Sequence, residues 1–128
     1  MGEGKSPPWK RPESVLVVVY TAAGDVLVLR RRQPPDFWQS VTGSLRWAEA
    51  DPLDAARREL REETGLGNEA EILACDVVNR FPILPPWRHR YAPNVTENTE
   101  HVFRVFLPER RLVTLDPAAH GEYEWRPR

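Results

Sequence analysis

Short apolar runs along the chain have the length and composition of β-strands. Ser14–Tyr20 is continuously apolar and rich in β-branched residues, as in a strand buried on both faces. Val26–Leu29 repeats this pattern after a short polar turn, so the two runs are predicted to form a hairpin. A short extended piece is predicted at residues 37–43, and further strands at residues 71–78, 101–107, 112–115 and 122–125.

One helix has clear signals at both of its ends. Asp51 suits an N-cap, Pro52 suits the first helical position, and Gly65 follows the last residue of the helical pattern. These signals predict a helix over Pro52–Thr64. Strands are predicted on both sides of a single long helix. This order favours an α/β fold with a mixed sheet covered by helix, rather than a parallel βαβ array.

Proline and glycine mark the regions expected to lie outside regular structure. Residues 1–9 combine glycine, proline and charge without periodicity and are predicted to form a flexible tail. Residues 10–128 have the length of one domain. A long loop is predicted before the strand at 101–107, because four prolines fall there: Pro82, Pro85, Pro86 and Pro93.

Composition excludes several classes of function. The 18 basic and 19 acidic residues leave a net charge of −1, and the arginines are interspersed with acids, so no nucleic-acid partner is expected. The longest apolar run is far shorter than the ~20 residues that cross a bilayer, and residues 1–12 lack the apolar core of a signal peptide. We therefore expect no membrane partner and a cytoplasmic protein. The single cysteine, Cys75, is predicted to be a core residue.

Three carboxylates share one face of the predicted helix. Glu59, Glu62 and Glu63 fall within an arc of ~100°, beside an apolar arc. A solvated face stabilised by pairs with neighbouring arginines is one explanation. However, the three like charges repel one another and lie toward the negative end of the helix dipole. A hard divalent cation held by oxygen ligands would offset both effects and would connect the helix to a phosphate substrate.

The spacing of these residues resembles the Nudix box, G-x5-E-x7-R-E-U-x-E-E-x-G-U, where U is aliphatic. The matching positions are Gly43, Glu49, Arg58, Glu59, Leu60, Glu62, Glu63, Gly65 and Leu66. Eight residues instead of seven separate Glu49 from Arg58. Because Asp51 and Pro52 restart the helix cleanly, the extra residue is expected to bulge in the loop and leave the helical carboxylates in register. The resemblance implies a Nudix-type α/β/α sandwich with a mixed sheet.

Two further stretches narrow the resemblance to one branch of this superfamily. Residues 36–44, and residues 88–93 with Thr96 and Asn98–Glu100, are similar to the bacterial dihydroneopterin triphosphate diphosphatases. The resemblance implies attack of water on the triphosphate, assisted by Mg²⁺ or Mn²⁺, which releases pyrophosphate and leaves dihydroneopterin monophosphate. A hydrolase of ordinary or damaged nucleoside triphosphates is the alternative within the same superfamily, because the metal site recognises only the diphosphate.

The same resemblance implies roles for individual residues. Glu59 and Glu63 would hold the metal, Glu62 would ligate a further ion or position water, and Arg58 would orient a carboxylate by an ion pair. Lys10, Arg31 and Thr42 would contact the substrate. The residues expected to line its pocket are Phe81, Pro82, Ile83 and Leu84. Stacking of Phe81, Trp38 or Trp87 on a pterin ring remains open beside the alternative that these rings belong to the core.

The chain departs from the family pattern near its C-terminus. Relatives carry a glutamate within a Pro-Ala-Glu-His setting, whereas this chain has Ala119 before His120. Asp116 or Glu122 could replace that carboxylate, and a non-catalytic Nudix-like binding module is the alternative if neither does. Family members also continue into a C-terminal helix that is expected to be missing here. The apolar surface that such a helix would cover favours a homodimer as a hypothesis.

Overall fold

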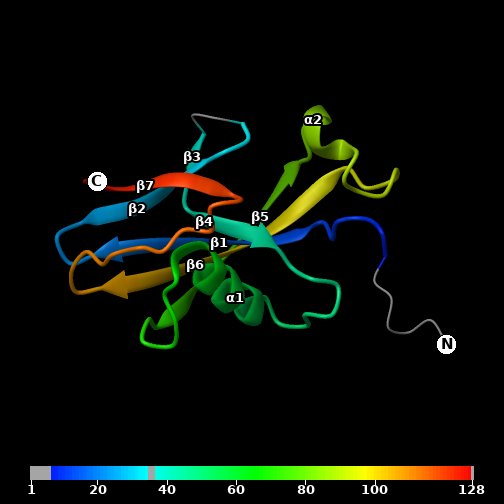
Figure 1. The fold of residues 1–128 in the computed structure, drawn as a ribbon. Helices are drawn as coiled ribbons and strands as arrows, with labels where there is room; N and C mark the ends of the chain where they lie inside the picture. The colour runs from blue at the N-terminus through cyan, green and yellow to red at the C-terminus, as the bar shows by residue number, and fades with distance from the viewer. Residues whose placement is uncertain (1–6, 35–36, 128) are drawn as a thin grey trace.

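One mixed sheet with a long helix against one face forms the framework of the protein (Figure 1). The computed structural model describes residues 7–34 and 37–127. Its elements, in chain order, are β1 (Glu13–Thr21), β2 (Asp25–Arg31), β3 (Trp38–Gln39), β4 (Val41–Ser44), α1 (Pro52–Thr64), β5 (Ile72–Pro82), α2 (Pro85–Arg88), β6 (Glu97–Leu107) and β7 (His120–Pro127).

Strand β1 lies at the centre of the sheet and has a different neighbour at each of its ends. Along its whole length it pairs in parallel with β6, from Glu13↔Thr99 to Thr21↔Leu107. On its other side it pairs with β2 only at Tyr20↔Val26, whereas β4 pairs with residues 14–17. The predicted hairpin is therefore confirmed, but β2 diverges from β1 after the turn and pairs with β3 and β7 instead.

The core lies between α1 and one face of the sheet. Alternate residues of β1, including Val15 and Val17, are fully buried with Leu60 of α1. The helix has the predicted limits. The Asp51 side chain accepts a hydrogen bond from the Leu53 amide at 3.0 Å, and Gly65 adopts the left-handed conformation at φ 78°. The local end signals thus place α1 where the sequence predicts it, and with it the acidic face.

The predicted strand at 112–115 is wrong. These residues form no strand, although Val113 is buried and Leu115 packs against the core. The backbone amide of Thr114 donates to the Thr64 carbonyl at 2.9 Å, which attaches this loop to the end of α1. The apolar pattern that indicated a strand therefore reflects packing of a loop against the core.

The region around β5 also differs from the prediction. The strand continues through Pro82, and the short helix α2 forms within the predicted loop. Cys75 is half-buried, so its assignment to the core is wrong. It lies in an irregular stretch where the register with β6 shifts between Ala74 and Val77, and Asp76 has φ 56°. Such a bulge turns side chains away from the regular alternation of the strand.

The described part of the predicted tail is tethered. Residues 1–6 of that tail lie outside the described residues, but the Trp9 carbonyl accepts a hydrogen bond from Trp47 Nε1 at 2.7 Å. The residue directly after the tail is also held, because the Lys10 amide donates to the Arg90 carbonyl at 2.8 Å. Within residues 7–34 and 37–127, the helices are too short and too polar to span a bilayer.

The sheet face opposite α1 carries exposed apolar side chains. Phe106 is 48% exposed and packs edge to face with Tyr20 at 5.6 Å between ring centroids. Leu73 and Val77 of β5 are also exposed. This is the kind of surface on which the predicted homodimer depends, and the dimer remains a prediction.

Candidate functional site

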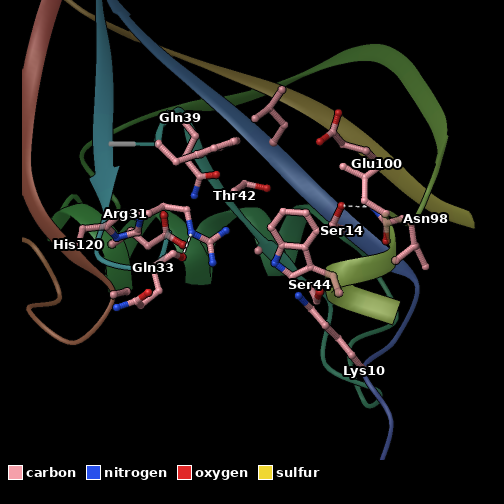
Figure 2. A pocket seen from close by; sticks show the side chains of 18 of the residues that line it. Lys10, Ser14, Arg31, Gln33, Gln39, Thr42, Ser44, Asn98, Glu100 and His120 are labelled. Carbon is pink, nitrogen blue, oxygen red and sulfur yellow. Dashed lines mark hydrogen bonds between the residues drawn. The ribbon is translucent and has the colours of Figure 1, made fainter. Parts of the chain in front are cut away.

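A large cavity opens where β2 diverges from β1 and β4 pairs with β1 instead. Its volume is about 920 Å³. Ser14 and Leu16 of β1, with Thr42 and Ser44 of β4, form part of its wall, and the segment that carries α2 lies on another side (Figure 2). This volume is within the range of cavities that bind small molecules and cofactors.

The structure brings the residues predicted to contact the substrate to this one cavity. Lys10, Arg31 and Thr42 line it, as do the aromatic residues Trp38 and Trp87. The four predicted pocket residues line it as well: Phe81, Pro82, Ile83 and Leu84. Their contact with a substrate remains a prediction.

Two buried glutamates of α1 lie beside this cavity. Glu59 and Glu63 are 9% and 8% exposed, and Glu63 lines the cavity. Burial, followed by the charge of neighbouring Glu59, raises the pKa of Glu63 to about 9. Burial also raises the pKa of Glu59. Among the described residues, Glu63 Oε1 has no hydrogen-bond partner. The protein therefore leaves one oxygen of Glu63 free, whereas Glu59 is paired with Arg58.

Arg58 connects the first acidic residue of the box to the helix. Its Nε and Nη2 donate to the two carboxylate oxygens of Glu49, both at 2.8 Å, and its Nη1 donates to Glu59 Oε2 at 2.9 Å. Nη2 also donates to the Ser44 carbonyl at 3.0 Å, which reaches β4. Because Glu49 meets Arg58 in this way, the extra loop residue is accommodated without separating them.

Glu62 lies at the edge of the acidic face and is held by two arginines. Its Oε1 accepts from Arg58 at 3.1 Å and its Oε2 accepts from Arg46 at 3.1 Å. Across residues 7–34 and 37–127, no three acidic, histidine or cysteine side chains are arranged to hold one metal ion. Two carboxylates still suffice for Mg²⁺, which usually keeps several waters and takes further oxygens from substrate phosphates. Glu59 and Glu63 fit that donor set.

Neither proposed replacement for the family glutamate reaches the cavity. Ala119 lines it, but Asp116 accepts a hydrogen bond from the Ala118 amide at 3.0 Å, and Glu122 pairs with Arg30 at 2.7 Å. Asp116 and Glu122 are absent from the cavity lining formed by the described residues. The hypothesis that one of them takes the place of the missing carboxylate is therefore not supported.

Sequence reasoning missed the polar groups at one side of the cavity. Asn98 and Glu100 of β6 line it and lie next to Ser14. The signal was their position two residues apart in a strand, which places both side chains on one face. The segment 98–100 contributed to the family resemblance, but no role was assigned to its residues.

Substitution of Gly43 by alanine is expected to impair both the site and the fold. A Cβ atom at this position would lie 2.0 Å from Glu59 Oε2, so the carboxylate would have to move. We expect at least about a 10-fold lower catalytic rate and a lower melting temperature, because the change combines overpacking with a displaced buried charge. Gly121→Ala is the matched control, since a Cβ atom at Gly121 would lie 3.7 Å from its nearest neighbour, Arg32 Nη1. Equal behaviour of the two variants would contradict the close approach of Glu59 to β4.

The stability of the protein without divalent cations is expected to fall as the pH rises from about 5 to 9. The folded-state pKa of Glu63 is about 9 and its ordinary value is 4.5, so between these values the folded state binds more protons than the unfolded state. The stabilisation from this bound proton is fully present below the ordinary pKa of 4.5 and is lost as the pH rises through the folded-state pKa of about 9. Urea unfolding in EDTA at a series of pH values gives the free energy of unfolding of the wild type and of Glu63→Gln. The effect is the difference between the two proteins in the slope of this free energy against pH. Parallel pH profiles would exclude it.

Comparison with known proteins agrees with the fold and with the box. The family model described as NUDIX domain matches residues 10–128. The dihydroneopterin triphosphate diphosphatase of Escherichia coli K12 is 44% identical over 125 residues, which cover 94% of this chain and 81% of the relative. Its counterpart in Haemophilus influenzae is 43% identical over 121 residues, covering 91% and 75%. The structure of the E. coli dihydroneopterin triphosphate pyrophosphohydrolase superposes with a TM-score of 0.85 at 41% identity, covering 94% of this chain and 83% of that one. The predicted Nudix-type fold is thus confirmed, and the chain belongs to the NUDIX family.

Proposed function

We propose that this protein hydrolyses dihydroneopterin triphosphate to dihydroneopterin monophosphate and pyrophosphate with the help of Mg²⁺ or Mn²⁺. The observation that carries the proposal is the buried Glu59–Glu63 pair beside a cavity that also contains Lys10 and Arg31. Anionic ligands for a cation and cationic ligands for phosphate therefore meet at one site. The names of the relatives supply the choice of substrate. A cytoplasmic location belongs to the same proposal.

In this proposal the acidic residues of α1 have different roles. Glu59 and Glu63 would hold the divalent cation, while Glu62 at the edge would ligate a further ion or position a water molecule. When bound, the cation neutralises charge on the polyphosphate and lowers the pKa of a water molecule. Arg58 keeps Glu59 oriented, because it binds Glu59, Glu49 and the Ser44 carbonyl at once.

Lys10 and Arg31 are suited to bind the phosphate chain. Arg31 uses its Nε for the Gln33 carbonyl at 2.9 Å, and among the described residues its terminal nitrogens stay available for phosphate oxygens. Burial, then the charges of Arg90 and Arg31, lowers the pKa of Lys10, so an anion at this point would relieve the repulsion. The Thr42 hydroxyl donates to the Val15 carbonyl at 2.8 Å and can accept a hydrogen bond from substrate.

The ring of the substrate would lie at the apolar part of the cavity. Phe81, Ile83 and Trp87 line this part. Trp38 is less suitable for stacking, because the Arg126 guanidinium already lies 4.5 Å from the centre of its ring. Phe81 and Trp87 are therefore the better candidates for contact with a pterin.

A second function is favoured by one observation, the alanine at position 119. With Asp116 and Glu122 engaged elsewhere, this site offers fewer carboxylates than the family pattern. A Nudix-like module that binds a triphosphate compound without hydrolysing it is the alternative from another class. A hydrolase of nucleoside triphosphates remains the alternative within the class.

One experiment separates these three functions. Pyrophosphate release is measured with dihydroneopterin triphosphate and with a panel of nucleoside triphosphates, in Mg²⁺ and in EDTA. The proposal expects Mg²⁺-dependent release with the highest kcat/KM for the pterin compound. Equal or better turnover of nucleotides would overturn the pterin assignment. Binding of the triphosphate in calorimetry without any release would establish the binding module.

A further inference from the structure

Asn98 is a buried polar residue in the cavity wall with one group left free. It is 5% exposed, and its Nδ2 donates to Ser14 Oγ at 2.8 Å (Figure 2). Its Oδ1 makes no hydrogen bond within the part of the chain that the structure describes. Buried acceptors are normally satisfied, so an acceptor left free beside a cavity points to a ligand that donates a hydrogen bond.

Glu100 adds a second acceptor on the same face of β6. Its Oε1 accepts a hydrogen bond from Asn79 Nδ2 at 3.3 Å. Among the described residues it has no cationic partner within ion-pair distance, although it lines the cavity. An ionised carboxylate only accepts hydrogen bonds, so Glu100 and the free Oδ1 of Asn98 together make an acceptor surface.

The neighbours of these two groups suit a flat heterocycle. Phe81 pairs with Asn98 in the ladder between β5 and β6, so its side chain lies beside Asn98 on the same face. Phe81 and Trp87 both line the cavity. In Figure 2, Arg31 and His120 lie on the opposite side of the cavity from Asn98 and Glu100. A ligand with phosphates near Arg31 can therefore extend its ring toward Asn98.

We propose that Asn98 and Glu100 recognise the hydrogen-bond donor edge of the substrate's ring. Asn98 Oδ1 accepts from an exocyclic amino group, and Glu100 accepts from the adjacent ring N–H. This inference rests on the proposed function, because it takes the ligand to be a triphosphate of a heterocycle. The 2-amino-4-oxo ring of a pterin presents this edge, and so does guanine. Hypoxanthine lacks the amino group, and adenine lacks the ring N–H.

The test is a comparison of GTP, ITP and ATP, which share one triphosphate. Dissociation constants are measured by calorimetry in EDTA, so that the result does not depend on hydrolysis. GTP and ITP differ only in the 2-amino group. We expect the wild type to bind GTP at least about 10-fold more tightly than ITP, and Asn98→Ala to reduce this ratio to about 2 or less. Asn98→Asp keeps an acceptor at this position and is expected to retain the preference.

Glu100 is tested by a second comparison. Glu100→Ala is expected to weaken GTP and ITP binding by similar factors, because both carry the ring N–H, and to leave ATP binding unchanged. Glu97→Ala is the matched control, since Glu97 is exposed at the start of the same strand and does not line the cavity. If Asn98→Ala fails to fold, the aspartate variant and Glu100→Ala carry the test.

The outcomes distinguish this inference from the proposed function. A wild type that binds GTP and ITP equally, or a ratio that Asn98→Ala leaves unchanged, would overturn the inference even if pyrophosphate is released. The inference is also overturned if Asn98→Asp loses the preference as the alanine variant does. Conversely, the expected binding pattern without any Mg²⁺-dependent release would support ring recognition while the proposed reaction fails.

Discussion

Replacement of Glu63 by glutamine is expected to lower the rate of pyrophosphate release at least about 100-fold. The Glu63 carboxylate lines the cavity and has a free oxygen among the described residues. Glutamine keeps its volume but presents one neutral oxygen, which is a weak ligand for a hard divalent cation. The measurement is kcat and kcat/KM for dihydroneopterin triphosphate over a range of Mg²⁺ concentrations.

The same substitution is expected to raise the melting temperature in EDTA. Burial and the nearby charge of Glu59 make an ionised group at this position unfavourable, as the raised pKa of Glu63 shows. A glutamine amide avoids that cost and can still donate to Glu59. Glu62→Gln is the control for the melting temperature alone, and it is not expected to raise it, because Glu62 is exposed and bound to arginines. A variant that loses both rate and stability would indicate a structural role, and an unchanged rate would remove Glu63 from catalysis.

The sequence was most informative where the determining contacts are local. Asp51, Pro52 and Gly65 act within one turn of the helix ends, so the limits of α1 could be predicted from the residues themselves. The arc of Glu59, Glu62 and Glu63 follows from helical periodicity alone. The residues that line the cavity were predicted from the resemblance to the family and not from local sequence patterns. No local rule brings Lys10, Arg31 and Phe81 to one place.

The remaining features depend on contacts between distant segments. Glu62 shares its helical arc with Glu59 and Glu63, yet Arg46 of the preceding loop holds one of its oxygens. The close approach of Gly43 to Glu59 depends on how α1 packs against β4. The strand predicted at 112–115 shows the same limit, because an apolar loop packed on the core has the composition of a strand. The pattern of apolar residues predicts which side chains are buried. It does not predict which segment their backbone groups bond to, so a buried loop and a buried strand look alike in the sequence.

Replacement of Arg58 by methionine is expected to lower the free energy of unfolding by about 1.5–3 kcal/mol, the usual range for losing hydrogen bonds to charged groups, because its ion pairs with Glu49 and Glu59 are partly buried. The Arg58 side chain is 16% exposed, and those of Glu49 and Glu59 are 15% and 12% exposed. Methionine fills a similar volume but removes the cation that pairs with both carboxylates among the described residues. Lysine restores one charge without the planar fork that binds both Glu49 oxygens, so Arg58→Lys is expected to recover only part of the loss.

Urea unfolding and Mg²⁺-dependent turnover together test this prediction. Arg61→Met is the matched control, since Arg61 is exposed one turn later on the same helix, and it is expected to change stability by no more than about 0.5 kcal/mol. Adding Glu49→Gln to Arg58→Met is expected to recover stability, because the double variant no longer buries the unpaired Glu49 charge. If Arg58→Met resembles Arg61→Met, or if the second substitution adds its full cost, the Arg58 fork does not organise the acidic site.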